Sequence, residues 1–161
     1  MVLGISVIHH RLLLLALCLV GWTTMSLATE QTATVGGWRL HLLDRNGVCI
    51  LEYTRGGVTK EFTLTPTPPC RFVDRPGAFP QTARLRTKSK MRTLVLVFGT
   101  PYQDTSFNLP AKDVYCGTVS QAVMLTNKKV YLSQRIAEGG LRCEGYGVDE
   151  REFMIFNEEW R

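Results

Sequence analysis

The sequence predicts a mainly β protein, a small antiparallel β-sandwich or barrel that begins as a meander, with at most one short C-terminal helix. Three observations predict this class. Apolar-rich runs alternate with polar residues, and turns rich in glycine or proline separate about seven of them. Asn46-Gly47 joins two runs as a two-residue hairpin turn. The four cysteines that follow residue 28 predict that two disulfides staple the fold.

Residues 1–28 have the pattern of a signal peptide, so we exclude them from the fold. Arg11 precedes the apolar run 12–20, which is too short to span a bilayer as an anchor. Ser26-Leu27-Ala28 places small residues at the two positions that a signal peptidase reads, so we expect cleavage after Ala28.

A lipoprotein signal at Cys18 is the alternative, but Leu17 stands where that signal needs a small residue. We therefore expect residues 29–161 to form a single exported β-rich domain with no transmembrane anchor. Removing the leader takes one cation, Arg11, and no acidic residue, so the formal net charge of +5 becomes +4. The compact leader and the lack of any Asn-x-Ser/Thr acceptor favour a periplasmic or secreted bacterial protein.

The cysteines that follow the leader are expected to form disulfides, because the compartment is oxidising. Zinc is the competing use, but the chain has no Cys-x-x-Cys pair and His41 is the only histidine after the leader. Four cysteines allow three pairings, and the sequence alone does not choose among them. We favour the pairs Cys49–Cys70 and Cys116–Cys143, each within one half of the chain.

The N-terminal half is predicted to be a three-stranded meander that follows a loose polar lead-in over 29–35. Strands over 38–44 and 48–54 flank the Asn-Gly turn, and a third is expected over 58–64 after a Gly-Gly turn. The residues expected to face inward are Trp38, Leu40, Leu42, Cys49, Leu51, Tyr53, Phe62 and Leu64.

The middle of the chain contains more residues that interrupt strands than the N-terminal half does. Prolines within 65–69 end the meander, because proline lacks the donor that a strand ladder needs. Residues 71–73 are expected to pair briefly, 74–80 to form turns, and 99–112 to form a long loop.

The most distinctive segment is 84–98, which we predict to be one extended strand. Its first half carries cations at period two, and its second half, 94–98, is apolar without interruption, as in a core strand. In one extended strand all these cations fall on the same face. This basic ladder comprises Arg84, Arg86, Lys88, Lys90 and Arg92.

The C-terminal half is predicted to contain a strand over 114–125, a turn at Asn127-Lys128 and a returning strand over 130–132. Gly139-Gly140 is expected to break the chain afterwards.

The tail from Asp149 fits either a short helix or a closing strand. A helix is favoured because Asp149 and Glu152 have the spacing of a capping box. Phe153, Phe156 and Trp160 would then share one helical face.

Catalysis finds little support in the sequence. His41, the single candidate base, lies in a predicted strand, and no nucleophile elbow or Cys-x-x-Cys occurs. No metal, cofactor or nucleic-acid motif is present either. A small carboxylate-dependent hydrolase is the enzymatic alternative, using two of the acidic residues Asp104, Asp113, Glu144, Asp149, Glu150 and Glu152.

The sequence therefore favours a binding module, most simply an inhibitor or immunity-type protein that blocks an exported enzyme or toxin. Its candidate contact residues are the basic ladder together with Tyr102 and Asp104 in the long loop. An envelope protein that binds anionic glycan or lipid through the basic strand is the alternative. The competing explanation of the ladder is a charged edge strand that resists pairing with other chains.

Overall fold

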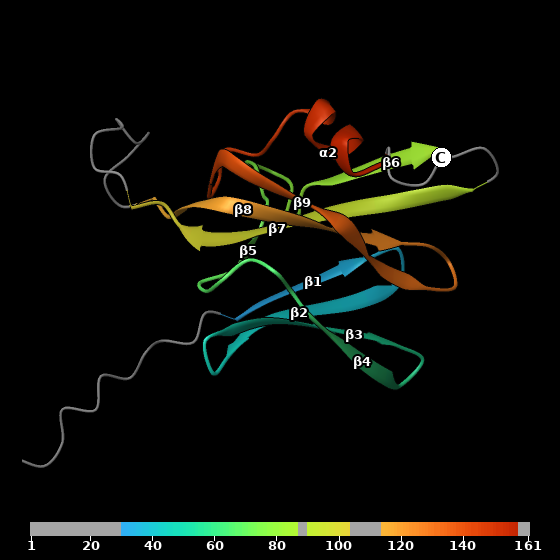
Figure 1. Ribbon diagram of the computed structural model, residues 1–161. Coiled ribbons are helices and arrows are strands. Elements are labelled where there is room, and N and C mark those ends of the chain that lie inside the picture. The colour runs from blue at the N-terminus through green and yellow to red at the C-terminus, as the bar shows by residue number, and fades with distance from the viewer. Residues whose placement is uncertain (1–29, 87–89, 104–113, 158–161) are drawn as a thin grey trace, which may run out of the picture.

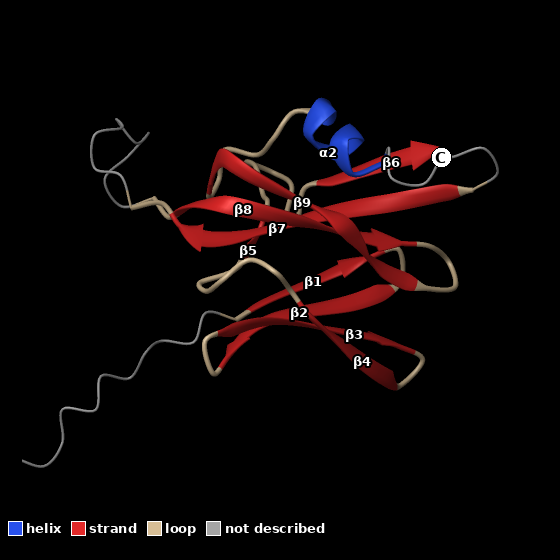
Figure 2. Cartoon of the chain, in the orientation of Figure 1, coloured by secondary structure: helices blue, strands red, loops and turns tan. Residues whose placement is uncertain are grey.

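The protein is a β-sandwich with one short helix on its outer face (Figures 1 and 2). The computed structural model describes residues 30–86, 90–103 and 114–157, which contain nine strands and one helix. One sheet has four strands in the order β1-β2-β3-β4. The other has five, in the order β5-β7-β8-β9, with β6 also paired to β7. All pairings are antiparallel, so the predicted fold class is confirmed.

The four-stranded sheet is a continuous meander of hairpins. Its strands are β1 (Gln31–Val35), β2 (Trp38–Arg45), β3 (Val48–Arg55) and β4 (Val58–Thr63). The Asn-Gly hairpin is confirmed, because φ is 55° at Asn46 and 76° at Gly47, as a type I′ turn requires. The inward face is the predicted one: all of its residues are buried except Phe62, which packs against the core while partly exposed.

The predicted loose lead-in over 29–35 is wrong, because β1 pairs with β2 along its whole length. Its alternation is short but real: Ala33 and Val35 are buried, while Thr32 and Thr34 point outward. Two glycines with positive φ, Gly36-Gly37, make the turn into β2. Threonine is polar, but it is β-branched and favours strands, so this segment forms a strand with one apolar face.

The five-stranded sheet is built around a long central strand. Its members are β5 (Arg71–Phe72), β6 (Thr82–Arg86), β7 (Met91–Pro101), β8 (Cys116–Leu125) and β9 (Val130–Cys143). β7 pairs with β8 along one side and with β5 and β6 in succession along the other. The short pairing predicted near residue 71 is confirmed by β5.

The predicted single strand over 84–98 is wrong. The chain reverses between β6 and β7, which form a hairpin with Arg86 opposite Met91. The predicted break at Gly139-Gly140 is also wrong, because β9 continues through both glycines to Cys143. The register shifts by two residues between Gly117 and Val119 of β8, and a bulge in β9 accommodates the glycines.

The core has two layers, one on each face of the five-stranded sheet. Val95 and Val97 of β7 face the four-stranded sheet and join the cluster between the sheets. Leu94, Leu96 and Phe98 face the opposite way, toward the helix. The apolar run of β7 is thus buried on both faces, as its sequence predicts.

The C-terminal segment forms helix α2 (Glu150–Asn157), which confirms the favoured alternative. The carboxylate of Asp149 caps it by accepting hydrogen bonds from the backbone N–H groups of Arg151 (2.8 Å) and Glu152 (3.2 Å). Phe153 and Phe156 are buried against the five-stranded sheet. Trp160 lies outside the described residues.

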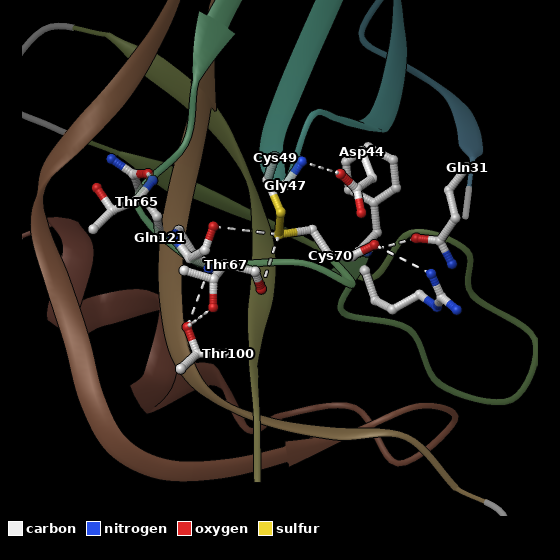
Figure 3. Close-up of a disulfide and its surroundings, with 12 residues drawn as sticks. Gln31, Asp44, Gly47, Cys49, Thr65, Thr67, Cys70, Thr100 and Gln121 are labelled. Atoms are coloured by element: carbon white, nitrogen blue, oxygen red, sulfur yellow. Dashed lines mark hydrogen bonds between the residues drawn. A yellow bond between two sulfur atoms is a disulfide. The ribbon is translucent and has the colours of Figure 1, made fainter. Parts of the chain in front are cut away.

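Both favoured disulfides are present, and they play different parts. Cys49 of β3 is bonded to Cys70, just before β5, so this bridge joins the two sheets (Figure 3). Cys116–Cys143 instead joins the neighbouring strands β8 and β9. Beside the first bridge the backbone passes so closely that a Cβ added at Gly99 would lie 2.8 Å from the Cys70 sulfur.

Candidate functional site

One end of the sandwich gathers turns from both sheets (Figure 1). The β1–β2 and β3–β4 turns of the four-stranded sheet lie there, with the β8–β9 turn and the β6–β7 hairpin of the other sheet. These turns come from segments far apart in the sequence. The cations that line this end form a surface we call the basic end: Arg55, Lys60, Arg84, Lys90, Arg92, Lys128 and Lys129.

The basic ladder contributes to this end, although not as a row on one face. In the β6–β7 hairpin Arg84 lies opposite Thr93, and Leu85 lies opposite Arg92. Directly opposed residues of antiparallel strands share a face, so Arg84 and Arg92 are on opposite faces of the sheet. Arg86 is exposed on the same face as Arg84, and Lys88 lies outside the described residues.

The β8–β9 turn, Thr126 to Lys129, is fixed by the side chain of its first residue. The Thr126 hydroxyl accepts hydrogen bonds from the backbone N–H groups of Lys128 (3.3 Å) and Lys129 (2.9 Å). It also donates to the carbonyl of Lys129 at 3.0 Å. Both lysines therefore project from a backbone whose conformation is set before any ligand arrives.

The same turn is tied to the four-stranded sheet. The indole N–H of Trp38 donates to the carbonyl of Thr126 at 2.8 Å. Arg55 donates to the carbonyl of Asn127, and its guanidinium lies over the Trp38 ring, 5.1 Å from the centroid. The aromatic and the arginine thus hold the tips of the two sheets together at this end.

Two larger hollows flank the turn. The inner hollow, about 440 Å³, opens toward the four-stranded sheet and is lined by Trp38, Tyr53, Arg55, Lys60, Lys128 and Lys129, among others. The outer hollow, about 470 Å³, opens on the side of the β6–β7 hairpin and is lined by Lys90, Met91, Arg92, Lys128, Lys129 and Tyr131, among others. A smaller hollow of about 230 Å³ includes Arg84.

Charge is distributed unevenly over the molecule. No acidic side chain of the described residues lines any of these three hollows. At the opposite end, by contrast, Arg45 donates to Glu61 (3.0 Å) and Glu52 (2.8 Å), and the hydrogen bond that Glu61 accepts raises the Arg45 pKa above its ordinary value. The basic end therefore presents a positive potential suited to a negatively charged ligand.

The predicted loop contacts do not join the basic end. The backbone N–H of Tyr102 donates to the carbonyl of Cys116 at 3.0 Å. Cys116 begins β8, whereas Lys128 and Lys129 follow the end of that strand. Tyr102 is therefore at the far end of the five-stranded sheet, and Asp104 lies outside the described residues.

The candidate catalytic groups have structural surroundings. His41 faces Glu52 across β2 and β3, with 3.2 Å between Nδ1 and Oε2, and its Nε2 is 3.5 Å from Glu30. The carboxylate of Glu144 pairs with Arg71, and that of Glu152 pairs with the buried Arg142. Glu144 and Glu152 are thus each held in an ion pair with an arginine, and His41 lies beside two carboxylates.

The two remaining acidic candidates among the described residues do not face each other across a cleft. Asp149 and Glu150 are adjacent at the start of α2, where both line a hollow of about 350 Å³ beside β6. The Asp149 carboxylate there is engaged in capping. Asp113, like Asp104, falls outside the described residues. No group of three or more His, Cys, Asp or Glu side chains within the described part of the chain is arranged to hold a metal ion.

Sequence reasoning missed most of the basic end, namely Arg55, Lys60, Lys128 and Lys129. The order of the hairpins along the chain indicates part of this surface. Successive hairpin turns alternate between the two ends of a meander, so the turn at 56–57 must lie at the end opposite Asn46-Gly47. What links that turn to Lys128 is the packing of the two sheets, which no local pattern encodes.

Comparison of the chain with protein-family models, with curated proteins and with solved structures gives no match. None of the described helical residues forms a segment long and apolar enough to cross a membrane. The geometry of the basic end is thus the main guide to function.

Proposed function

We propose that this protein is an exported binding module that holds an anionic glycan or lipid of the cell envelope at its basic end. The observation that carries the proposal is the set of three adjoining hollows lined by cations and, among the described residues, by no carboxylate. Arginine and lysine side chains gathered on one surface attract phosphate, sulfate or carboxylate groups. The rigid β8–β9 turn supports this role, because a preorganised site loses less entropy on binding.

Export is part of the proposal and rests on two features. The first 28 residues have the pattern of a signal peptide, and the remaining cysteines are paired in disulfides, which persist in oxidising compartments. An envelope polymer or lipid is the anionic ligand that such a protein meets in quantity.

The inhibitor or immunity hypothesis stays a prediction. That hypothesis requires a contact surface formed by the long loop, which includes Asp104, and by the basic ladder as one continuous row of cations. The described residues of the ladder are divided between two faces of a hairpin, so they do not form one flat docking strip.

The test is a binding titration with a pair of substitutions that removes two positive charges. Lys128→Gln/Lys129→Gln removes the two cations shared by the inner and outer hollows. We expect affinity for anionic vesicles, lipopolysaccharide or a sulfated polysaccharide to fall about 25-fold, at about fivefold for each cation. Calorimetry at low ionic strength measures this, and wild-type binding should weaken as salt is raised.

The matched control is Arg135→Gln/Arg151→Gln, which makes the same change in net charge at exposed positions near α2. Its affinity should stay within about twofold of wild type if the site is local rather than a property of net charge. Equal weakening by the two double variants, or no binding of any anionic probe by the wild type, contradicts the proposed function.

A further inference from the structure

The β8–β9 turn is a ridge between two hollows. Lys128 and Lys129 line both the inner and the outer hollow. The inner hollow shares Trp38 and Tyr53 with the core between the sheets. The outer hollow includes Tyr131, which packs with the cluster on the helix-facing side of the sheet. The two hollows therefore lie on opposite sides of one hairpin tip.

We infer that the ligand is a linear polyanion, a glycan chain with repeated anionic groups, which crosses this ridge and occupies both hollows at once. The inference rests on the proposed function and names its ligand class. A chain that spans the ridge meets the shared lysines at its middle. On either side it meets one further pair of cations: Arg55 with Lys60 in the inner hollow, or Lys90 with Arg92 in the outer hollow.

A single anionic headgroup uses this arrangement poorly. It can enter one hollow and contact the ridge, but it does not reach the cations of the other hollow. A chain with charges along its length satisfies both sets, and once one part is bound the other binds at high effective concentration. The two-sided distribution of cations is therefore better matched to a polymer.

A bilayer surface is also a poorer match. Surfaces that insert into membranes place several apolar side chains together on one face. Here the exposed apolar residues are divided: Val58 (61% exposed) lines the inner hollow and Met91 (57% exposed) lines the outer hollow. The ridge between them carries the two lysines. A chain can lie along such a divided surface, whereas a flat membrane would rest on the ridge.

The experiment compares a sulfated disaccharide with a sulfated decasaccharide, both prepared from heparin, as probes of short and long polyanions. Three single variants are titrated in the full chain with its disulfides formed. Lys60→Gln alters only the inner hollow, and Lys90→Gln alters only the outer one. Arg151→Gln, exposed on α2, is the control of equal charge. Each substitution is at an exposed position, and a thermal melt checks that each variant is folded.

We expect the decasaccharide to bind at least tenfold more tightly than the disaccharide. Lys60→Gln and Lys90→Gln should each weaken the decasaccharide about fivefold, and each should weaken the disaccharide less than about twofold, because a short probe can use the other hollow. Arg151→Gln should leave both affinities unchanged.

Two results overturn the inference while leaving the proposed function standing. One is weakening of the decasaccharide by only one of the two hollow variants. The other is tight binding of vesicles rich in phosphatidylglycerol together with no binding of either oligosaccharide, which assigns the basic end to a lipid surface. Failure of the wild type to bind oligosaccharides, vesicles and inorganic sulfate at low ionic strength overturns both the inference and the proposed function.

Discussion

The side chain of Tyr115 lies beside both an aromatic ring and a guanidinium group. Its ring stacks on Phe98, with 5.7 Å between centroids, and the Arg71 guanidinium lies 5.7 Å from its own centroid. Its hydroxyl oxygen is buried and has no hydrogen-bond partner among the described residues. Burial raises the pKa of Tyr115 to about 12, with the positive charge of Arg71 acting in the opposite direction.

Alkaline pH should therefore destabilise the protein through Tyr115. In the unfolded chain a tyrosine ionises near pH 10, so above that pH the unfolded state binds fewer protons than the folded state. The free energy of unfolding should fall as pH rises from about 10 to about 12. We expect a loss of about 1 kcal/mol, less than the full pKa shift would give, because the side chain is partly exposed to screening solvent.

Tyr115→Phe isolates this contribution from other alkaline titrations. At neutral pH the variant should be as stable as wild type or more stable, because it removes an unpartnered hydroxyl while keeping the stacked ring. Its loss of stability between pH 10 and 12, followed by urea denaturation, should be shallower. Tyr146→Phe, at a side chain that is 57% exposed, is the control and should follow the wild-type curve. Identical slopes for all three proteins would show that Tyr115 does not titrate differently on unfolding.

Among the elements, α2 shows how a short helix is made stable by its surroundings. Eight residues are too few for a helix to persist alone in water. Two buried phenylalanines attach it to the five-stranded sheet, and Glu152 pairs with the buried Arg142 of β9. In the predicted capping box Asp149 performs its part, whereas the Glu152 carboxylate is directed to Arg142.

Removing the cap should weaken this element measurably. Asp149→Ala deletes the carboxylate that accepts from the N–H groups of Arg151 and Glu152, and we expect a loss of about 1 kcal/mol in the free energy of unfolding. Asp149→Asn keeps a hydrogen-bond acceptor in place. It should lower the free energy of unfolding by only a few tenths of a kcal/mol, chiefly because the negative charge at the helix start is lost. Urea denaturation of the three proteins measures both. Equal losses for Ala and Asn would attribute the effect to charge rather than to the cap hydrogen bonds.

The strands that the sequence predicts well are those whose signal is local. The Asn46-Gly47 turn and the alternation that flanks it specify the β2–β3 hairpin without help from the rest of the fold. The cations from Arg84 to Arg92 alternate equally well, yet the chain turns back within them. Within one strand, alternation shows which residues share a face. It does not show where the chain reverses direction when the residues before and after the turn both alternate.

The candidate site was less predictable than the fold for a related reason. Arg84, Lys90 and Arg92 stood out because they are close together in the sequence. Lys128 reaches the same end through the pairing of β8 with β7, in which Leu125 lies opposite Thr93, and the bond from Trp38 to the carbonyl of Thr126, 88 residues away, joins this turn to the other sheet. A surface assembled from several turns has no sequence motif of its own.

At the scale of the whole molecule, the two ends of the sandwich are held in different ways. Cys49 lies near the start of β3, and Cys116 opens β8, so both disulfides lie at the end opposite the β3–β4 and β8–β9 turns. The basic end is held instead by noncovalent contacts that Trp38 and Arg55 make with the β8–β9 turn. The disulfides and the proposed binding surface thus lie at separate ends of the sandwich.

This separation predicts that disulfide loss reduces stability without altering the site. Cys49→Ala/Cys70→Ala and Cys116→Ala/Cys143→Ala open loops of 21 and 27 residues in sequence separation. Each should lower the free energy of unfolding by about 3 kcal/mol, because the freed unfolded chain gains conformational entropy. Because the two loops are of similar length, the entropic contributions of the two disulfides to stability should be nearly equal. A larger loss of stability for Cys49→Ala/Cys70→Ala would therefore measure the further role of that bridge between the sheets.

Affinity for an anionic probe should meanwhile stay within about twofold of wild type in whichever variant remains folded, because the contacts that position Lys128 and Lys129 are intact. Far-UV circular dichroism establishes the folded fraction, urea denaturation gives the stability, and calorimetry gives the affinity. A folded variant that lost affinity in step with stability would show that the sheets shift relative to each other when the bridge is removed. The basic end would then depend on the disulfides through the packing of the whole sandwich.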